Sequence, residues 1–459
     1  MRRIWSALAI MALWMAVVHA VVRPAPLQAQ AGSAAQTGAA SAQDDPVRTL
    51  VGRLDLEKYK ATIKGLAQFG DRRQGTDRNR AANDWIEAQL KSYGCSDVGR
   101  IKYDYAPAPR TTGAADAGRG GAAAAAARGR GGAGAGGGTA AAGRGGAATG
   151  GGQAAPAQGR GRGAAAPVKG NRGPTGVNND PEKQPDAQLR ALDMQPTAPG
   201  PREEVYCTKI GSTRPGEMYI VSGHMDGIGY GAGANDNASG TALVMEVARV
   251  LSAPDVQTDR SIRFVLWNNE ETGLNGARAY IEQRGPLQGK EDPPGSGKYP
   301  EPKWLGLIAH DMMLFDHGMP GPDGKVGAEQ RAEADVNIEF PGDLPGRAGA
   351  GPSTSKMAAQ SQELAWVFKA ASDRYATDYP AVVGNRMSNT DSAAFQDLVA
   401  SISLREAERL SQVGSGWDPH WHQPTDVFAT FSDKDFRLGL NAAQTTLAAI
   451  AQLTGAKMK

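Results

Sequence analysis

The sequence predicts an α/β protein, a three-layer α/β/α sandwich whose central sheet is mixed but mostly parallel. The main observation is that short apolar runs alternate with longer segments of helical periodicity after Arg202. This order is typical of buried parallel strands joined by crossover helices. A second observation is that residues 46–106 carry helical periodicity and one strand-like run, so they are expected to complete the same domain.

The ordered region is expected to begin at Pro46, where a polar stretch ends. Helical spacing is first seen at Leu50, Leu54, Leu56 and Ile63, and a second apolar stripe follows at Ala82, Trp85, Ile86, Leu90 and Tyr93. The second stripe should end at Gly94, because glycine takes the left-handed conformation that terminates many helices. The run VGRIKYDYA at 98–106 then predicts a strand.

Residues 201–456 should form the larger part of the domain. Strands are expected in five apolar runs, EVYCTKI (204–210), EMYIVSG (217–223), SIRFVLW (261–267), WLGLIA (304–309) and VASISL (399–404). Ser239 and Ser432 are expected to cap two helices of this part. A third helix is marked by apolar residues at helical spacing, Leu364, Val367, Phe368 and Ala371.

Residues 107–200 are expected to be a disordered insertion on the rim of the domain. They are rich in Gly, Ala, Arg and Pro and contain almost no large apolar side chains, so folding would not offset the entropy lost on ordering. Arg-Gly repeats also occur in RNA-binding tails, but this segment has no interleaved aromatic residues. The composition therefore favours a solvated linker.

Residues 1–31 have the features of a secretory signal peptide and its cleavage region. Arg2 and Arg3 precede an apolar run from Ile4 to Val18, and small residues follow in VHA and again in LQAQA. The alternative is an uncleaved anchor, because the run approaches the roughly 20 residues that span a bilayer. We expect an exported protein, periplasmic or secreted, with 32–45 as a linker and no stable membrane insertion after cleavage.

The charge balance and the cysteine count narrow the possible partners and sites. The chain has 50 basic and 48 acidic residues, so its net charge of +2 gives no field that would attract nucleic acid. Only Cys95 and Cys207 are present, too few for a zinc site built from thiolates. In an oxidising compartment these two could pair, but they could also be buried thiols.

Candidate metal ligands follow the ends of the predicted strands, where ligands bind in open α/β sheets. Two histidines and four acidic residues occupy such positions or the glycine-rich loop before the Ser239 helix, and they are His224, Asp236, Glu270, Glu271, Asp311 and His422. Imidazole nitrogens and carboxylate oxygens are both donors that zinc accepts. The sequence therefore predicts a zinc centre at this edge of the sheet.

Two ions held close together need a shared ligand, and Asp236, a short carboxylate in a tight loop, is the natural bridge. One ion would then take His224 and Asp311, and the other would take His422 and Glu271. The expected cofactor is therefore a pair of zinc ions.

Two further acidic residues are given supporting roles. Asp226 is expected to accept the free imidazole proton of His224 and so fix its tautomer. Adjacent residues in an extended stretch point opposite ways, so one glutamate can bind metal while its neighbour faces the reacting water. We assign Glu271 to the metal and Glu270 to the role of general base.

The ordered motifs GHMD, GANDNASG, NNEETGLNGARAY, HDMM and WHQPTD resemble family twenty-eight of the metallopeptidases. That family includes co-catalytic zinc aminopeptidases, glutamate carboxypeptidases and glutaminyl cyclases. The resemblance spans residues 46–453 around the insertion. It implies a fold of the zinc-exopeptidase type, the same ligands with Glu270 as base, and a cis peptide after Asp236. The chain departs from the family pattern at His310, where many relatives have Asn, and at Ser392, where many have His.

From this resemblance we expect a zinc-dependent aminopeptidase that takes peptides as substrates. A glutaminyl cyclase with one zinc ion, a carboxypeptidase-type relative and a non-catalytic binding protein remain alternatives. The sequence leaves the preferred residue and the oligomeric state open.

The remaining candidates receive structural interpretations. His317 and His420 are expected to be satisfied polar residues, although His420 is the only rival to His422 as the last ligand. His310 could support a ligand or belong to the core, and Trp417 and Trp421 could line a substrate pocket or simply pack. Asp391 and Arg405 are expected to be structural.

Overall fold

The computed structural model of the protein describes residues 45–95, 97–105, 177–315, 336–342, 355–379, 381–384, 390–406 and 418–459. From Pro46 onwards they belong to one compact unit. The predicted signal peptide and nearly all of the linker, the insertion up to residue 176, His317 and Trp417 lie outside the described residues.

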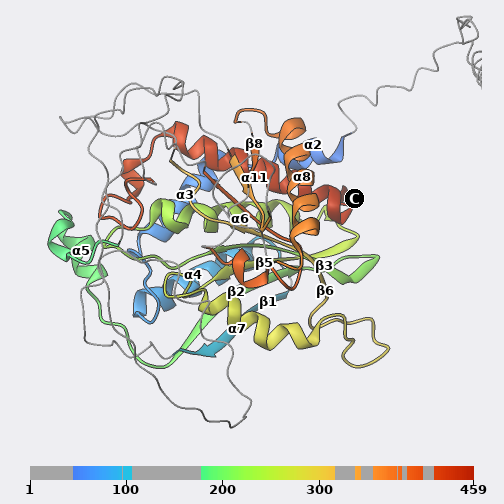
Figure 1. Ribbon diagram of the computed structural model, residues 1–459, viewed down its shortest axis with the longest axis horizontal. Helices are drawn as coiled ribbons and strands as arrows, with labels where there is room; N and C mark the ends of the chain where they lie inside the picture. The colour runs from blue at the N-terminus through green and yellow to red at the C-terminus, as the bar shows by residue number, and fades with distance from the viewer. Residues whose placement is uncertain are drawn as a thin grey trace, which may run out of the picture. The chain divides into compact units, whose positions relative to one another are not determined.

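An eight-stranded mixed sheet forms the middle layer (Figure 1), in the order β1-β2-β5-β3-β6-β9-β7-β8. The strands are β1 (Asp97–Asp104), β2 (Pro201–Lys209), β3 (Arg214–His224), β5 (Arg260–Trp267), β6 (Lys303–His310), β7 (Val336–Glu339), β8 (Ala381–Gly384) and β9 (Ser401–Glu406). Strands β5, β3, β6 and β9 are parallel neighbours, whereas β1 and β2 are antiparallel additions at one edge. The predicted mixed, mostly parallel sheet is confirmed.

Adjacent residues of the central strands face two different cores, because side chains alternate across a sheet. In β3, Ile220 belongs to one buried cluster and its neighbour Val221 to the other, and both are fully buried. Burial on both faces explains why these strands appear in the sequence as continuous apolar runs.

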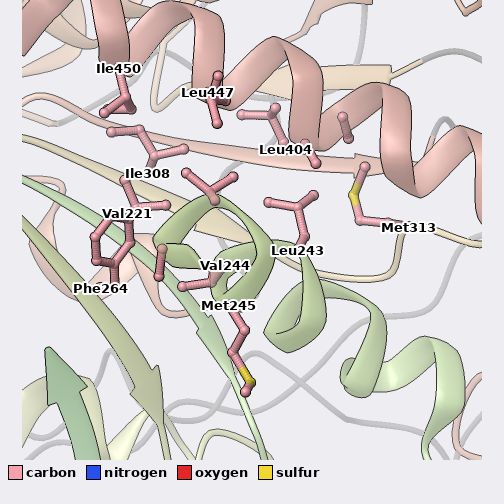
Figure 2. Close-up of a cluster of buried hydrophobic side chains, with 14 of the residues drawn as sticks. Val221, Leu243, Val244, Met245, Phe264, Ile308, Met313, Leu404, Leu447 and Ile450 are labelled. Carbon is pink, nitrogen blue, oxygen red and sulfur yellow. The ribbon is translucent and has the colours of Figure 1, made fainter. Parts of the chain in front are cut away.

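Helices cover the face on which Val221 lies. They are α2 (Pro46–Val51), α3 (Leu56–Ala67), α4 (Asp77–Ser92), α6 (Gly240–Leu251), α8 (Ala358–Tyr375) and α11 (Asp433–Thr454). Figure 2 shows Leu447 and Ile450 of α11 lying over strand residues such as Ile308, with Leu243 of α6 beside them. Each such side chain stabilises the fold by roughly 1.5–3 kcal/mol when it is fully buried.

The opposite face is covered by α7 (Asn275–Arg284) and the short α9 (Ser392–Phe395). Its core is largely aromatic: Trp267 contacts Tyr280 edge-on with ring centroids 5.2 Å apart, and Phe395 packs on both rings and on Trp304. Figure 1 shows α7 and α11 on opposite sides of the strands. The three-layer α/β/α arrangement is therefore as predicted.

The helix ends follow local capping chemistry. The Asp55 carboxylate accepts the Glu57 and Lys58 amides at the start of α3, and α4 is followed by Gly94 with a φ of +84°. Ser432 and Asp435 form a capping box at the start of α11, as expected. The expected Ser239 cap is wrong, because that residue is already helical and its hydroxyl donates to the Asn235 carbonyl oxygen.

The remaining elements are short. They are η3 (Ala234–Ser239), η4 (Gly285–Leu287), η6 (Phe428–Thr430) and the two-stranded sheet of β4 (Val256–Gln257) and β10 (Lys457–Met458). No helix in the described part of the chain has the length and apolar character needed to cross a bilayer.

Cys95 and Cys207 form a disulfide, with Cα atoms 6.1 Å apart. Cys207 lies in β2, and β1, which begins two residues after Cys95, pairs with β2 along its whole length from Asp97–Thr208 to Asp104–Pro201. The disulfide therefore joins the parts of the domain that precede and follow the low-complexity segment, and the alternative of two buried thiols does not hold.

Residues 177–200 do not behave as the disordered insertion expected for 107–200. They contain η2 (Pro181–Lys183) and α5 (Ala187–Asp193), and they bind the body of the domain. Buried Asp193 accepts the Asp71 amide at 3.0 Å, and the Ala198 amide donates to Gly75. The composition did not predict this ordered segment, because its contacts are polar and non-local and produce no apolar pattern in the sequence.

Candidate metal centre

His224 is placed by the register of the central strands. It is the last residue of β3, opposite Trp267 of parallel β5, while Gly223 lies opposite His310 of parallel β6. Parallel strands end at the same edge of a sheet, so the residues after Trp267 and after His310 are brought to His224. This is the physical basis for the cluster expected from the sequence.

The His224 ring contacts two predicted ligands. Its Nε2 lies 3.4 Å from Asp236 Oδ1 and 3.4 Å from Asp311 Oδ1. Its Nδ1 lies 3.0 Å from the backbone carbonyl oxygen of Asp226 but 3.8 Å from the nearer carboxylate oxygen. Asp226 thus accepts from Nδ1 through its carbonyl oxygen and not through its carboxylate, which favours the tautomer in which Nδ1 carries the proton and Nε2 is free to bind. The carboxylate instead accepts the Glu270 amide at 3.1 Å.

Asp236 lies between the two histidines in η3. His224 Nε2 faces its Oδ1 and His422 Nε2 faces its Oδ2, the latter at 2.9 Å. The Asp426 carboxylate accepts the backbone amides of Asn235 and Asp236 at 2.7 and 3.0 Å and so holds this loop from behind. The Asp236–Asn237 peptide is cis, as the family resemblance implied.

His422 and Glu271 complete the second half of the cluster. His422 Nε2 lies 2.9 Å from Glu271 Oε2, and both side chains are at most 10% exposed. The ring stacks on Trp421 with centroids 4.1 Å apart. Each imidazole therefore faces one carboxylate of its own and one oxygen of the shared Asp236.

The two adjacent glutamates differ in their contacts. Glu271 lies with His224 and Asp236 in a group whose potential ligand atoms are all within 4.8 Å of one another. Within the described ranges, Glu271 but not Glu270 comes within ion-pair distance of an imidazole. Asn269, just before them, has a φ of +64°, so the chain turns sharply as it leaves β5.

Burial and charge together shift the ionisation of the cluster. Burial raises the pKa of Glu270 well above its ordinary range and that of Glu271 to about 7, against the opposing effect of the histidines. Burial also acts to raise the pKa of Asp236, but the hydrogen bonds with both imidazoles outweigh it and lower that pKa. The cluster is a buried excess of acidic groups, an environment that favours a bound cation.

Two residues expected to be structural lie at the cluster. Arg405 donates to Asp311 Oδ2 at 3.2 Å, which leaves Oδ1 for the side facing His224. The buried Asp391 carboxylate has no hydrogen-bond partner among the described residues, and burial, together with the carboxylates of the cluster, raises its pKa against the opposing effect of His224. The sequence around Asp391 does not indicate that it lies near the cluster. For Arg405 the only local signal is its position at the end of β9.

The other described histidines do not join the cluster. His310 bridges the Ser222 carbonyl oxygen and the Thr446 hydroxyl, at 2.9 and 2.8 Å, and burial lowers its pKa to about 4, so it is a neutral core residue. His420 Nδ1 lies 2.8 Å from the Thr425 hydroxyl, and its ring packs on Phe431. Trp421 stacks on His422.

The donors present suit zinc. Two imidazole Nε2 atoms and three carboxylates divide into two sets that share Asp236, as a two-metal site requires. Glu271 Oε1 is buried and has no hydrogen-bond partner in the part of the chain that the structure describes, so it remains available to a cation.

Comparison with known proteins agrees with the motifs. Residues 205–297 match the model of Peptidase family M28. An aminopeptidase of Bacillus subtilis, YwaD, is 30% identical over 122 residues, which are 27% of this chain and 26% of that protein. An aminopeptidase of Pseudomonas aeruginosa is 32% identical over 127 residues, 26% and 22% of the two chains. The aligned part thus spans about a quarter of the length of these curated relatives.

Solved structures share the fold over a much larger part of the chain. A zinc aminopeptidase from Bacillus subtilis superimposes with a TM-score of 0.51 at 15% identity, covering 87% of this chain and 96% of that one. An aminopeptidase from an Aneurinibacillus strain gives 0.50 at 16% identity, with 90% and 97% covered. At such identities the likeness concerns the fold alone, and it agrees with the predicted α/β class.

Proposed function

We propose that this chain, a member of peptidase family M28, is an exported aminopeptidase that hydrolyses the first peptide bond of its substrates with the aid of two zinc ions. The amino-end preference is supported by the relatives from Bacillus subtilis and Pseudomonas aeruginosa, both of which are aminopeptidases. The metal is supported by the donor set and by a structural neighbour described as a zinc aminopeptidase.

The proposed ligands follow the contacts within the cluster. His224 and Asp311 would hold one ion, His422 and Glu271 would hold the other, and Asp236 would be shared between them. When bound, zinc would polarise the scissile carbonyl and lower the pKa of water at the site. Arg405 and the Asp226 carbonyl oxygen keep Asp311 and His224 in their orientations.

Glu270 acts as the general base in this proposal. As the water oxygen attacks the carbonyl carbon, Glu270 takes the water proton and then gives it to the leaving amine, so that the peptide C–N bond breaks with an acid and an amine as products. The buried position of Glu270 raises its pKa, which suits a group that must both accept and return a proton.

The proposal of export rests on the residues before Pro46 together with the disulfide. Residues 1–31 have the signal-peptide pattern, and the Cys95–Cys207 pair would be stable in the periplasm or outside the cell, where disulfides persist. Export predicts that the mature protein begins after Ala20 or near Ala31, which amino-terminal sequencing of the cell-purified protein would reveal.

The observation that carries the proposed function is that two imidazoles face opposite oxygens of Asp236 while only one of the two adjacent glutamates approaches them. We therefore expect Glu270→Gln to keep two zinc ions per chain and to lose about 10²–10⁴-fold in kcat with little change in KM. Glu271→Gln should lose zinc. Zinc content by atomic spectroscopy, beside turnover on aminoacyl chromogenic substrates, separates the two roles.

The matched control is Glu282→Gln, an exposed glutamate on α7 that should change neither readout. The opposite pattern, zinc lost in Glu270→Gln and kept in Glu271→Gln, would invert the assignment. A wild-type protein that binds zinc but turns over neither free nor blocked peptides would indicate a binding protein, and turnover of amino-terminal glutamine with one zinc ion would indicate a cyclase.

A further inference from the structure

The segment that follows the low-complexity residues crosses the loops of the metal centre. The backbone amide of Asn178 donates to the His422 carbonyl oxygen at 3.0 Å, and its side-chain amide donates to the Gly229 carbonyl oxygen at 3.2 Å. The Gln184 amide donates to the carbonyl oxygens of Tyr230 and Pro424, at 2.7 and 3.0 Å. Two residues thus connect the loop after β3 to the loop that carries His422.

Both connecting side chains are buried, with 6% of Asn178 and 2% of Gln184 exposed. The two loops they join are in backbone contact: a Cβ atom on Gly229 would overlap the backbone of His422, and the Ala232 amide donates to the Asp426 carbonyl oxygen at 2.8 Å. Buried amide donors on buried carbonyl oxygens are costly to remove, because the oxygens are left without partners.

His422 is the ligand that needs such support. Its Nδ1 is buried without a hydrogen-bond partner in the described ranges, whereas Nδ1 of His224 is held by a carbonyl oxygen. Its backbone is in the left-handed region, with a φ of +55°, which is unfavourable for a residue other than glycine. Stacking on Trp421 orients the plane of the His422 ring, but the position of the His422 backbone depends on the neighbouring segments.

We propose that residues 178–184 form a clamp that positions His422 and thereby controls how tightly the second metal position is held. This inference rests on the proposed two-zinc function and adds a positioning role for Asn178 and Gln184, outside the set of ligands. Apart from the shared Asp236, the first metal position depends on β3, on Asp226 and on Arg405, and the hydrogen bonds of Asn178 and Gln184 in the described structure reach none of these.

The test compares zinc release from the two positions without any substrate. Protein loaded with two zinc ions is mixed with excess chromogenic chelator, and the two release phases are followed; the phase that is absent in Glu271→Gln belongs to the His422 position. Gln184→Met keeps the length of the side chain but removes both donors. We expect it to speed the His422 phase about 10–100-fold and to leave the other phase unchanged.

Matched controls use neighbouring residues of the same type. Gln188→Met changes an exposed glutamine on α5 and should leave both phases at the wild-type rate. Asn178→Ala, with exposed Asn179→Ala as its control, removes one donor of the clamp and should speed the same phase by a smaller factor. If Gln184→Met folds poorly, the Asn178 pair carries the comparison.

Equal release from Gln184→Met and wild type would overturn the clamp, as would acceleration of both phases together, which indicates general destabilisation. Failure of the proposed function is seen separately. A protein that binds two zinc ions with clamp-dependent release but hydrolyses no peptide would contradict the proposed aminopeptidase activity. It would still support the positioning role of the clamp. A wild-type chain that binds no zinc would contradict both the proposed function and the clamp.

Discussion

The two halves of the metal centre are built in different ways. His224 ends a central strand, its Nδ1 is held at 3.0 Å by the Asp226 carbonyl oxygen, and its partner Asp311 is held by Arg405 at 3.2 Å. His422 lies in a loop between β9 and α11, its Nδ1 has no hydrogen-bond partner among the described residues, and its carbonyl oxygen is bound by Asn178 from a remote segment.

If both histidines bind metal as proposed, one ligand is placed by strand register and the other by contacts between loops. Strand register places His224 at the end of a buried strand, so moving it would disturb buried residues such as Val221 and Ile220. The position of His422 depends on a few polar contacts between loops, each worth about 0.5–1.5 kcal/mol. We therefore expect the two halves to respond differently to substitution.

The largest effect is expected where the halves meet. Asp236→Asn keeps the shape of the side chain but removes the charge that both imidazoles face. Zinc affinity at both positions should fall by more than about 100-fold, the upper end of the loss seen when only an indirect partner of a ligand is removed. Zinc titration followed by calorimetry measures it. A loss of zinc affinity at one position only would show that Asp236 is not shared. Asp433→Asn, on the surface, is the control and should leave zinc affinity unchanged.

A smaller effect, confined to the His224 half, is expected from Arg405→Gln. The change leaves the buried Asp311 carboxylate without its guanidinium, and breaking a buried pair typically costs about 3–5 kcal/mol. The free energy of unfolding of the metal-free protein should fall by that amount in denaturant titration, and the His224 position should lose zinc first. Arg53→Gln, at the exposed pair with Asp255, should cost less than about 1 kcal/mol. Equal losses of unfolding free energy in Arg405→Gln and in the control variant would contradict the distinction between the buried and the exposed pair.

The smallest effect concerns pH and Asp193, at the end of the helix α5 that follows the clamp. Burial and the neighbouring charge of Asp71 raise the pKa of Asp193 to about 7, against Arg78 and Arg72. The folded state therefore keeps this proton at pH values where the unfolded chain has lost it. Stability falls by about 1 kcal/mol per pH unit between pH 4 and 7 and then levels.

Asp193→Asn retains an oxygen for the Asp71 amide but has no proton to lose. The variant should lack this part of the pH dependence and be the more stable form above pH 7, by comparison of denaturant midpoints at pH 5, 6, 7 and 8. Parallel pH profiles for the two proteins would mean that Asp193 does not titrate in this range.

The strands that could be predicted were those buried on both faces. The runs at 217–223, 261–267 and 304–309 became β3, β5 and β6 within a few residues, because continuous apolar sequence is what a doubly covered strand requires. Strands β7 and β8 were missed, since four residues are too few to show a period. Helix α7 was missed because half of its residues are polar or charged and exposed or only partly buried.

The candidate ligands could be predicted for a related reason. Residues after parallel strands meet at one edge whatever their sequence separation, so acids and histidines at those positions are expected to gather. Arg405, Asp426, Asn178 and Gln184 could not be found in this way. Their roles are hydrogen bonds to groups up to 244 residues away, as for Asn178 and His422, and no periodicity encodes such a contact.

The sequence by itself determined the α/β class, the main strands and the residues available to a metal, because periodicity and residue chemistry are local properties of the chain. Tertiary structure alone decided that the Asp226 carbonyl oxygen, and not its carboxylate, holds His224, that Cys95 and Cys207 pair, and that residues 177–200 bind the domain. These outcomes depend on which backbone atoms the fold brings within hydrogen-bonding distance, and that distance is set by the packing of all three layers together.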